Sequence, residues 1–249
     1  MIIIKSDAEI EMMKIPAKLT AEVLRDLGDF IKPGISTHDI DQFVEKRILE
    51  GGMIPAFKGY GGFPASACVS VNEVIVHGIP SRERKLKEGD IVSVDAGAVY
   101  QGWYSDMART YPVGEISPEA ARLVRVTEES FFEGLKYCVE GNYLSDVSHA
   151  IQTHLESNGF GVIRDYVGHG LGREMHEQPP VPNYGRPGRG PKLQKGMVLA
   201  IEPMVSAGSY AVNVMPDKWT AVTADGSLAA HYENTVVITD AEPQVITLL

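Results

Sequence analysis

LKEGDIVSVDAGAVYQGWYSDMARTYP, residues 86–112, is the stretch of this chain that decides its fold. Its first part predicts a buried, apolar strand that ends near Asp95, followed by a turn and a returning strand. If the turn is centred between Tyr100 and Gln101, Asp95 and Asp106 are cross-strand partners. Their Cβ atoms would then lie roughly 5 Å apart on one face of a hairpin.

Two carboxylates at that distance repel each other. Either one of them takes up a proton, or a cation lies between them. A cation in an oxygen-rich site indicates chemistry with hard divalent metals. The alternative is that the two aspartates lie on different faces of the strands, because one residue of slip in the register would separate them. The hairpin alone leaves both interpretations open.

The composition is ordinary for a soluble globular protein, with 249 residues of which 44% are hydrophobic and 22% charged. The formal net charge is −10 and no run of Lys or Arg resembles a phosphate-binding footprint, which argues against a nucleic-acid substrate. Two cysteines, Cys68 and Cys138, are not a disulfide framework and fit a reducing cytoplasm. The N-terminus lacks the apolar core of a signal peptide, and no apolar run is long enough for a membrane span.

Four helices and a strand-rich remainder are expected in the rest of the chain. The residues from Ser6 to Glu9 have the pattern of a capping box, and Thr37 is expected to cap a second helix. Ser117 and Ser145 are expected to begin two further helices. The four helices should end near Phe30, Gly51, Cys138 and Asn158, and a glycine-rich loop is expected at 58–64.

A shift of 107 residues brings two halves of the chain, about 1–120 and 121–249, into register. With this shift Asp95 falls on Glu202, which would carry a third carboxylate to the same place about a pseudo-twofold axis. Chance is the alternative, since glycines and aliphatic residues are common. Other matched pairs are Gly34 with Gly141, Ile40 with Val147, Gly89 with Gly196 and Ile91 with Val198.

Further residues able to do chemistry lie at predicted strand ends. His169 stands between glycines, and a second histidine, His176, follows seven residues later. Glu202 ends an apolar run, and Glu233 begins a buried strand. A lone histidine is more often structural than catalytic, but a buried carboxylate without a partner is costly. It must therefore meet a cation or be protonated.

The candidate ligands are four carboxylates and one imidazole: Asp95, Asp106, His169, Glu202 and Glu233. The absence of CxxC, HExxH and Walker A motifs leaves zinc-finger, HExxH-type protease and P-loop interpretations without support, and the spacing is not that of an EF-hand. Carboxylate-rich sites with one histidine suit a pair of first-row divalent ions. Two such ions, roughly 3.5–4 Å apart, can together activate a water and polarise a carbonyl group.

Taken together, these motifs resemble type I methionine aminopeptidase over essentially the whole chain. They are VDAG at 94–97, the aspartate eleven residues later, GHGLGREMH at 168–176, AIEP at 200–203 and the glutamate at 233. The resemblance implies an α+β pita-bread fold, in which two pseudo-symmetric αβ halves share a central antiparallel sheet backed by helices. It implies one catalytic domain, residues 1–249, that removes the initiator methionine when the second residue is small.

The resemblance also implies roles for the ligands and for the side chains around them. Asp106 and Glu233 would bridge two divalent ions, manganese, iron, cobalt or zinc, with Asp95 on one ion and His169 and Glu202 on the other. In the catalytic set, His77 would contact the substrate amide, His176 would hydrogen-bond the scissile carbonyl oxygen, and Glu202 would be the general base. The implied substrate-binding residues are Phe57, Tyr60, Phe63, Cys68, His77, Met175, His176 and Trp219.

Three of these pocket residues, Phe57, Phe63 and Met175, stand where other family members carry different apolar or aromatic groups. For Tyr60, Phe63 and Trp219 the alternative is plain packing in the core, which is the usual place of aromatic residues. As partners the resemblance implies nascent polypeptide N-termini and the ribosome near its exit tunnel, with no membrane, a monomeric state and a cytoplasmic location.

Three rival interpretations follow from the same fold. Aminopeptidase P and prolidase use a similar ligand set but usually carry a large additional N-terminal domain. Type II methionine aminopeptidases carry a helical insertion late in the chain, for which 249 residues leave no room. A non-catalytic binding module would be expected to have lost ligands, whereas all five are present here.

Overall fold

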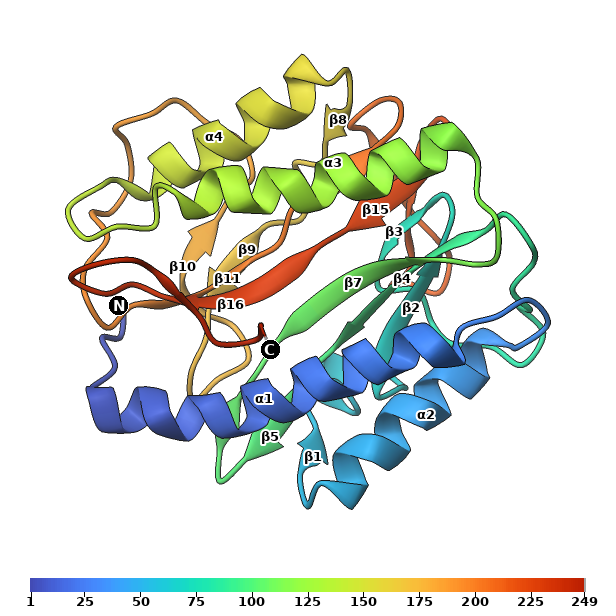
Figure 1. Cartoon of the computed structure of the whole chain (residues 1–249), viewed down its shortest axis with the longest axis horizontal. Coiled ribbons are helices and arrows are strands. Elements are labelled where there is room, and N and C mark those ends of the chain that lie inside the picture. The colour runs from blue at the N-terminus through green and yellow to red at the C-terminus, as the bar shows by residue number, and fades with distance from the viewer. Residues whose placement is uncertain (249) are drawn as a thin grey trace.

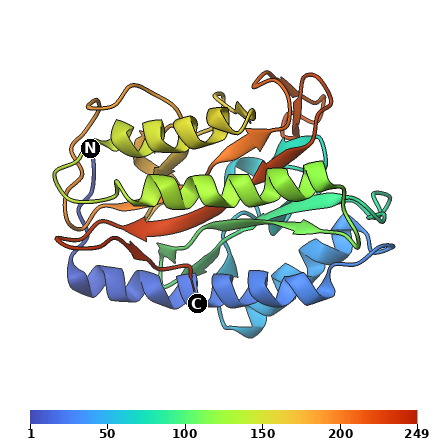
Figure 2. The ribbon, with the colours of Figure 1, turned by 45° about the horizontal axis from the view of Figure 1, so that its top comes forward.

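The computed structural model describes residues 1–248 and shows two similar halves built around one sheet (Figure 1). Each half contributes a pair of helices, which contact mainly the strands of their own half, although α3 also contacts β7. Figure 2 shows both pairs on the same side of the central strands. The helices are α1 (Asp7–Phe30), α2 (Thr37–Glu50), α3 (Pro118–Leu135) and α4 (Leu144–Ser157), with a short 3-10 turn at Tyr60–Gly62.

The N-termini of the first two helices are capping boxes. In α1, Ser6 and Glu9 exchange hydrogen bonds as expected. In α2 the cap is Ser36, not the expected Thr37: the Ser36 hydroxyl accepts the Asp39 N–H at 3.2 Å, and the Asp39 carboxylate accepts the Ser36 N–H at 2.8 Å. Thr37 instead donates its hydroxyl to the Ser81 carbonyl at 3.1 Å.

The second pair of helices also differs from the prediction at its ends. Helix α3 stops at Leu135, before the expected Cys138, because the N–H groups of Tyr137 and Cys138 bond to carbonyls only three residues back. Helix α4 begins at Leu144 because Asp146 accepts the N–H of Tyr143, one turn earlier, at 2.8 Å. The expected cap, Ser145, accepts the N–H of Arg189 instead.

The central sheet has the strand order β10-β9-β11-β16-β7-β4-β2, with β17 also paired to β16, and its neighbours run antiparallel. The two halves meet where β16 pairs with β7, between the helix pairs in Figure 1. The strands are β1 (Ile54–Pro55), β2 (Ala67–Val71), β3 (Val74–Val76), β4 (Ile91–Ala96), β5 (Ala98–Tyr100), β6 (Trp103–Tyr104), β7 (Met107–Pro112), β8 (Gly161–Val162), β9 (Gly168–Gly170), β10 (Glu177–Val181), β11 (Val198–Ile201), β12 (Met204–Ser206), β13 (Val212–Val214), β14 (Ala221–Thr223), β15 (Ala229–His231), β16 (Glu233–Val237) and β17 (Gln244–Val245).

The hairpin of the opening stretch forms with a register different from the predicted one. Asp95 lies opposite Ala108, not opposite Asp106. The turn is centred between Gln101 and Gly102, both at positive φ (49° and 77°), as a tight two-residue hairpin turn requires. The error in the register is two residues. Because side chains alternate with a period of two, Asp95 and Asp106 still belong to the same face of the hairpin.

The predicted duplication is visible in the backbone. The shift of 107 residues carries both bounds of α2 onto those of α4, and both bounds of β1 onto those of β8. The isolated bridge between Ser36 and Lys85 recurs at the shifted positions, between Tyr143 and Lys192. The fold is therefore an α+β pita-bread fold with two pseudo-symmetric halves.

Each half has its own apolar core beneath its helices. Leu24 and Ile40 are fully buried in the first half, and Phe131 and Ile151 in the second. Two cores joined by one continuous sheet hold the seam between β7 and β16 rigidly, so side chains from both halves can be positioned against each other. Within residues 1–248, none of the helices is both long and apolar enough to cross a membrane.

Candidate metal centre and substrate pocket

A cavity of about 200 Å³ is lined by side chains from both halves of the molecule. One end of the cavity is acidic and the other is apolar. Every residue predicted for the site from the sequence lines this cavity, and Gly61 is added to them. The lining residues are Phe57, Tyr60, Gly61, Phe63, Cys68, His77, Asp95, Asp106, His169, Met175, His176, Glu202, Trp219 and Glu233.

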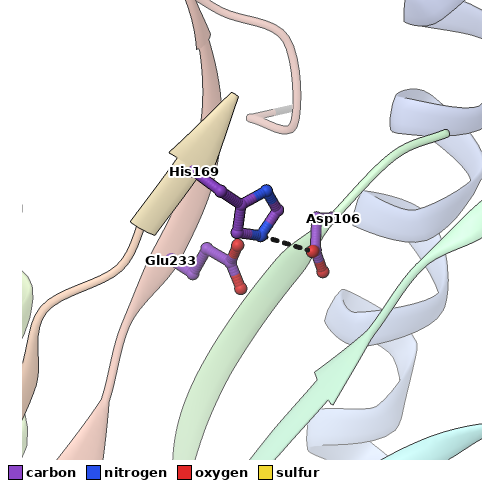
Figure 3. Close-up of side chains that lie close together, drawn as sticks. All are labelled: Asp106, His169 and Glu233. Atoms are coloured by element: carbon purple, nitrogen blue, oxygen red, sulfur yellow. Dashed lines mark ion pairs between the residues drawn. The ribbon is translucent and has the colours of Figure 1, made fainter. Parts of the chain in front are cut away.

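The acidic end contains a tight cluster of three possible ligands, Asp106, His169 and Glu233 (Figure 3). One ligand atom from each of the three lies within 4.8 Å of the others. The Nε2 atom of His169 is 3.5 Å from an oxygen of Asp106 and 3.6 Å from an oxygen of Glu202. Asp95 and Glu202 line the same cavity but lie outside the three-residue cluster.

The order of the strands explains how ligands so distant in sequence meet. Asp95 lies on β4, and Asp106 directly precedes β7, the next strand in the sheet. Glu233 is the first residue of β16, Glu202 directly follows β11, and His169 is at the centre of β9. These five strands are consecutive neighbours in the sheet, so the five side chains lie on adjacent strands or directly at their ends.

The hydrogen bond of His169 fixes which ring nitrogen faces the carboxylates. Its Nδ1 lies 2.9 Å from the Gly170 carbonyl, an acceptor, so Nδ1 carries the proton in the neutral ring. Burial lowers the pKa of His169, which favours that neutral form. The Nε2 lone pair therefore faces the acidic oxygens, an arrangement that is repulsive unless a proton or a cation lies between them.

The carboxylates show the same need for a proton or a cation. Burial, followed by the effect of the neighbouring carboxylates, raises the pKa of Asp95, Glu202 and Glu233 well above the usual range, and burial raises that of Asp106 to about 8. Within residues 1–248, one buried oxygen on each of Asp95, Asp106 and Glu233 has no hydrogen-bond partner. Carboxylate oxygens with one imidazole nitrogen are a donor set that first-row divalent ions accept, so these residues fit a metal centre.

The apolar end of the cavity has the character of a side-chain pocket. Phe63 and Met175 are almost fully buried, and the Phe63 ring meets Trp219 edge-on with centroids 5.2 Å apart. Burial, with the charge of Asp95, raises the pKa of the Cys68 thiol well above its usual range, so it lines the pocket as a neutral group. A flexible, unbranched apolar side chain would suit this space.

Two histidines stand between the acidic and apolar ends. The Nδ1 atom of His176 is 2.8 Å from the Tyr60 hydroxyl, and its ring centroid is 4.2 Å from that of His169. Partial burial and His169 lower the pKa of His176 to about 4, which keeps it neutral near pH 7. If Nδ1 accepts the Tyr60 proton, Nε2–H remains free to donate. His77 has a φ of +58°, a strained backbone conformation of the kind found at functional sites.

Sequence reasoning assigned no role to His231, which borders the same cluster. Its Nε2 is buried without a hydrogen-bond partner among the described residues, 3.7 Å from Glu202 and 4.0 Å from Glu233. Burial, followed by the charges of His77 and Arg109, lowers its pKa to about 3. One signal in the sequence could have placed His231 at the site. It stands two residues before Glu233, and alternate residues of a strand share a face.

The fold and the site together define a class, a metal-dependent hydrolase with a carboxylate-rich centre at the seam of two pseudo-symmetric halves. Residues 11–240 match the family model described as metallopeptidase family M24. The chain belongs to metallopeptidase family M24 and, within it, to the methionine aminopeptidases. It is accordingly a metal-dependent aminopeptidase.

Similar sequences cover the whole chain. It is 60% identical over 248 residues to a methionine aminopeptidase of Clostridium acetobutylicum, covering 100% of this chain and 99% of that protein. It is 51% identical over 247 residues to methionine aminopeptidase 1 of Bacillus subtilis, covering 99% of each.

Similar structures agree with this placement. A crystal structure of methionine aminopeptidase from Thermotoga maritima has a TM-score of 0.98 and 53% identity, with full coverage of both chains. Prolidase from Pyrococcus furiosus has a TM-score of 0.78 and 24% identity, covering 99% of this chain and 66% of that one, and shows the shared fold alone.

Proposed function

We propose that this chain uses a dinuclear metal centre to remove the initiator methionine from nascent polypeptides whose second residue is small. The observation that carries the proposal is a single cavity with a cluster of possible metal ligands at one end and an apolar pocket at the other. A substrate whose side chain fills the apolar end would present its first peptide bond to the acidic end. The names of the relatives support methionine as that side chain.

Five side chains would hold the two ions, manganese, iron, cobalt or zinc. Asp106 and Glu233 would bridge them, Asp95 would complete one site, and His169 and Glu202 would complete the other. When bound, such ions activate a water and polarise a carbonyl group. Both residues that we propose as bridges belong to the cluster of possible ligands formed with His169.

We assign a role in the hydrolysis of the peptide bond to each of three side chains. His176, with Nε2–H free, would donate to the scissile carbonyl oxygen as that oxygen becomes anionic. His77 would contact the amide of the substrate. Glu202 would take up the proton of the attacking water.

The preference for a small second residue is a steric proposal. Tyr60 is 42% exposed, and its hydroxyl meets His176 at 2.8 Å, so the two side chains narrow the mouth of the cavity. The glycine-rich loop behind Tyr60 is held by a hydrogen bond from Gly59 N–H to the Phe63 carbonyl at 2.8 Å. A large second side chain would collide with this mouth while the first lies in the pocket.

The wider setting is also part of the proposal. Residues 1–249 would act as one catalytic domain, because Asp95 and Asp106 come from the first half and the other ligands from the second. We infer a cytoplasmic monomer that acts on nascent N-termini near the ribosomal exit tunnel. The support is the resemblance to the family and two buried cysteines that are not joined in a disulfide. The net charge of −10 argues against a nucleic-acid substrate.

The deciding experiment measures amino acids released from Met-Ala-Ser and from an Ala-Pro peptide, with and without added Mn²⁺. Free methionine from Met-Ala-Ser, only when metal is present, is the expected result. Release of alanine from the Ala-Pro peptide would identify a proline-directed peptidase instead. No release from either peptide by metal-loaded protein would indicate a binding module. In parallel, an activity that saturates with one bound metal per chain would overturn the dinuclear centre.

A further inference from the structure

The loop between β9 and β10, residues 171–176, carries two residues of the site, Met175 and His176. Among the described residues, its own backbone closes one hydrogen bond, from Gly172 N–H to the Glu174 carbonyl at 3.2 Å. A loop with so little internal bonding must be held by other groups if it is to present His176 in one orientation.

Glu177, the residue directly after His176, holds this loop from behind. One oxygen of its carboxylate accepts the backbone N–H groups of Arg173 at 2.8 Å and Glu174 at 3.3 Å. A Cβ atom added to Gly172 would lie 2.5 Å from the same oxygen, so the loop wraps closely around the carboxylate. Glu177 therefore fixes the backbone of the loop at Arg173 and Glu174.

The other oxygen of Glu177 binds Lys5, which comes from the opposite end of the chain. The Lys5 ammonium lies 2.5 Å from it, and the two side chains are only 2% and 3% exposed. The Lys5 N–H donates to the Gly196 carbonyl at 2.8 Å, and Ile2 forms a parallel bridge with Gln178. In Figure 1 the N-terminal segment lies at the same edge of the molecule as β10 and then enters α1.

Because both charges are buried, the ion pair of Lys5 and Glu177 strongly constrains the position of the loop. Each buried charge is stabilised by the other, and removal of one partner leaves the second charge buried and uncompensated. Lys5 directly precedes Ser6, the cap of α1, so its backbone is anchored at the start of a long helix. The ion pair thus connects a rigid element of the first half to the loop that carries His176.

We propose that Lys5 and Glu177 form a positioning pair that orients His176 and Met175, so that the N-terminal segment of the chain controls the geometry of the catalytic loop. Neither side chain lines the cavity, and both act through the loop. The inference deepens the proposed function, since it rests on His176 as the donor to the carbonyl oxygen.

The test in solution uses Glu177→Gln, which retains an oxygen for the two backbone N–H groups but loses the charge. We expect kcat for Met-Ala-Ser to fall about tenfold or more, toward the ~10²-fold that a misplacement of about 1 Å can cost, with KM changed less. In a His176→Ala background the same substitution should lower kcat no further, because the effect on kcat passes through His176, whereas Met175 lies in the pocket and acts on binding. An additional loss of the same size in that background would show a merely structural role and overturn the proposal.

A second readout does not depend on activity. In metal-free protein, hydrogen exchange across residues 171–177 should become faster in Glu177→Gln, and NMR should show the His176 ring losing its contact with Tyr60. Unchanged exchange and an unchanged His176 signal would overturn the positioning pair even if the aminopeptidase activity is confirmed. Conversely, full activity in His176→Ala would refute the role of His176 as donor. The positioning pair of Lys5 and Glu177 would then be tested by hydrogen exchange and NMR alone.

Two further variants complete the design. Lys14→Met breaks an exposed ion pair with Glu11 on the same helix, and it should leave kcat and loop exchange unchanged. If Glu177→Gln does not fold, the double variant Lys5→Met/Glu177→Gln removes both buried charges together and should fold while keeping fast exchange at 171–177. Wild-type exchange in this double variant would overturn the proposal.

Discussion

At the scale of single residues, the site is built from groups that are unfavourable without a ligand. Glu233 is 1% exposed, yet one of its oxygens has no hydrogen-bond partner among residues 1–248. His77 lies at a φ of +58°, where residues with a Cβ are strained. Such costs persist only where the surrounding structure imposes them, and here they converge on one cavity. Substitutions at these residues should therefore change function more than folding.

Asp106→Ala and Glu233→Ala should each abolish activity and remove at least one metal ion, because each residue is assigned as a bridge. The loss should exceed the ~10–100-fold that follows removal of a partner outside the coordination shell. Metal content per chain, counted by plasma mass spectrometry, is the measurement. Asp240→Asn, at an exposed carboxylate paired with Lys195, is the matched control and should keep its metals. Two ions retained in either bridging variant would refute the ligand assignment.

His176→Ala should separate chemistry from binding. A donor to an oxygen that becomes anionic acts mainly in the transition state, so its loss should lower kcat ~10²–10³-fold, about 2.7–4 kcal/mol, with a small change in KM. The neutral ring contacts Tyr60 by a hydrogen bond and carries no buried charge, so the melting temperature and metal content should stay as in the wild type. Loss of metal, or markedly earlier melting, would identify His176 as a ligand or a structural residue.

At the scale of elements, the hairpin shows how far sequence reasoning could reach. The strands and the shared face of Asp95 and Asp106 were predictable, because apolar strands that end in carboxylates stand out. The register was not, since choosing Gln101-Gly102 rather than Tyr100-Gln101 depends on which residues adopt positive φ. Ser36 and Thr37 are a second example: two adjacent hydroxyls can each cap a helix, and the bonds of Ser36 with Asp39 and of Thr37 with Ser81 decide between them.

The duplicated elements supply a matched pair of glycines for a stability experiment. Gly89 and Gly196 occupy equivalent turns with φ of +90° and +87°. Alanine at either position should cost about 1–2 kcal/mol for the left-handed backbone. At Gly196 the new Cβ would also lie 2.5 Å from the Lys5 carbonyl oxygen, whereas at Gly89 the nearest atom is 3.8 Å away. Urea unfolding should therefore show the larger loss for Gly196→Ala. Equal losses would mean that the N-terminal segment moves aside freely.

The loop at 58–64 should determine the choice of substrate. Because Tyr60 and His176 narrow the mouth of the cavity, we expect efficient cleavage of Met-Gly, Met-Ala and Met-Ser peptides and poor cleavage of Met-Leu and Met-Lys peptides. The measurement is kcat/KM across the series. A parallel series with Tyr60→Ala tests the cause, since a wider mouth should reduce the difference between Met-Ala and Met-Leu. Equal kcat/KM for all five peptides with the wild type would refute the steric explanation.

At the scale of the whole molecule, the site exists only because two similar halves meet. The repeat in the sequence already placed Asp95 and Glu202 at equivalent strand ends. It could not show that His231 borders the same cluster, because that depends on how β15 and β16 are turned against the seam. It also could not show that Lys5 reaches Glu177, since a contact across 172 positions has no local signal in the sequence.

The metal should also determine how the stability of the whole molecule depends on pH. Without metal, the folded-state pKa of Asp106 is about 8, against roughly 3.9 in an unfolded chain. A carboxyl group with a raised folded-state pKa contributes stability that is complete below about pH 4 and is lost as the pH rises toward 8. The pKa shifts of Asp95, Glu202 and Glu233 have the same direction.

The melting temperature of metal-stripped protein should therefore fall between about pH 5 and pH 8. Saturating Mn²⁺ should remove this fall, because a cation replaces the protons that the carboxylates would otherwise need. Metal-stripped Asp106→Asn should show a shallower fall, since one titrating group is gone. A melting temperature that rises with pH in the stripped wild type would contradict the assignment of these four carboxylates to one metal centre.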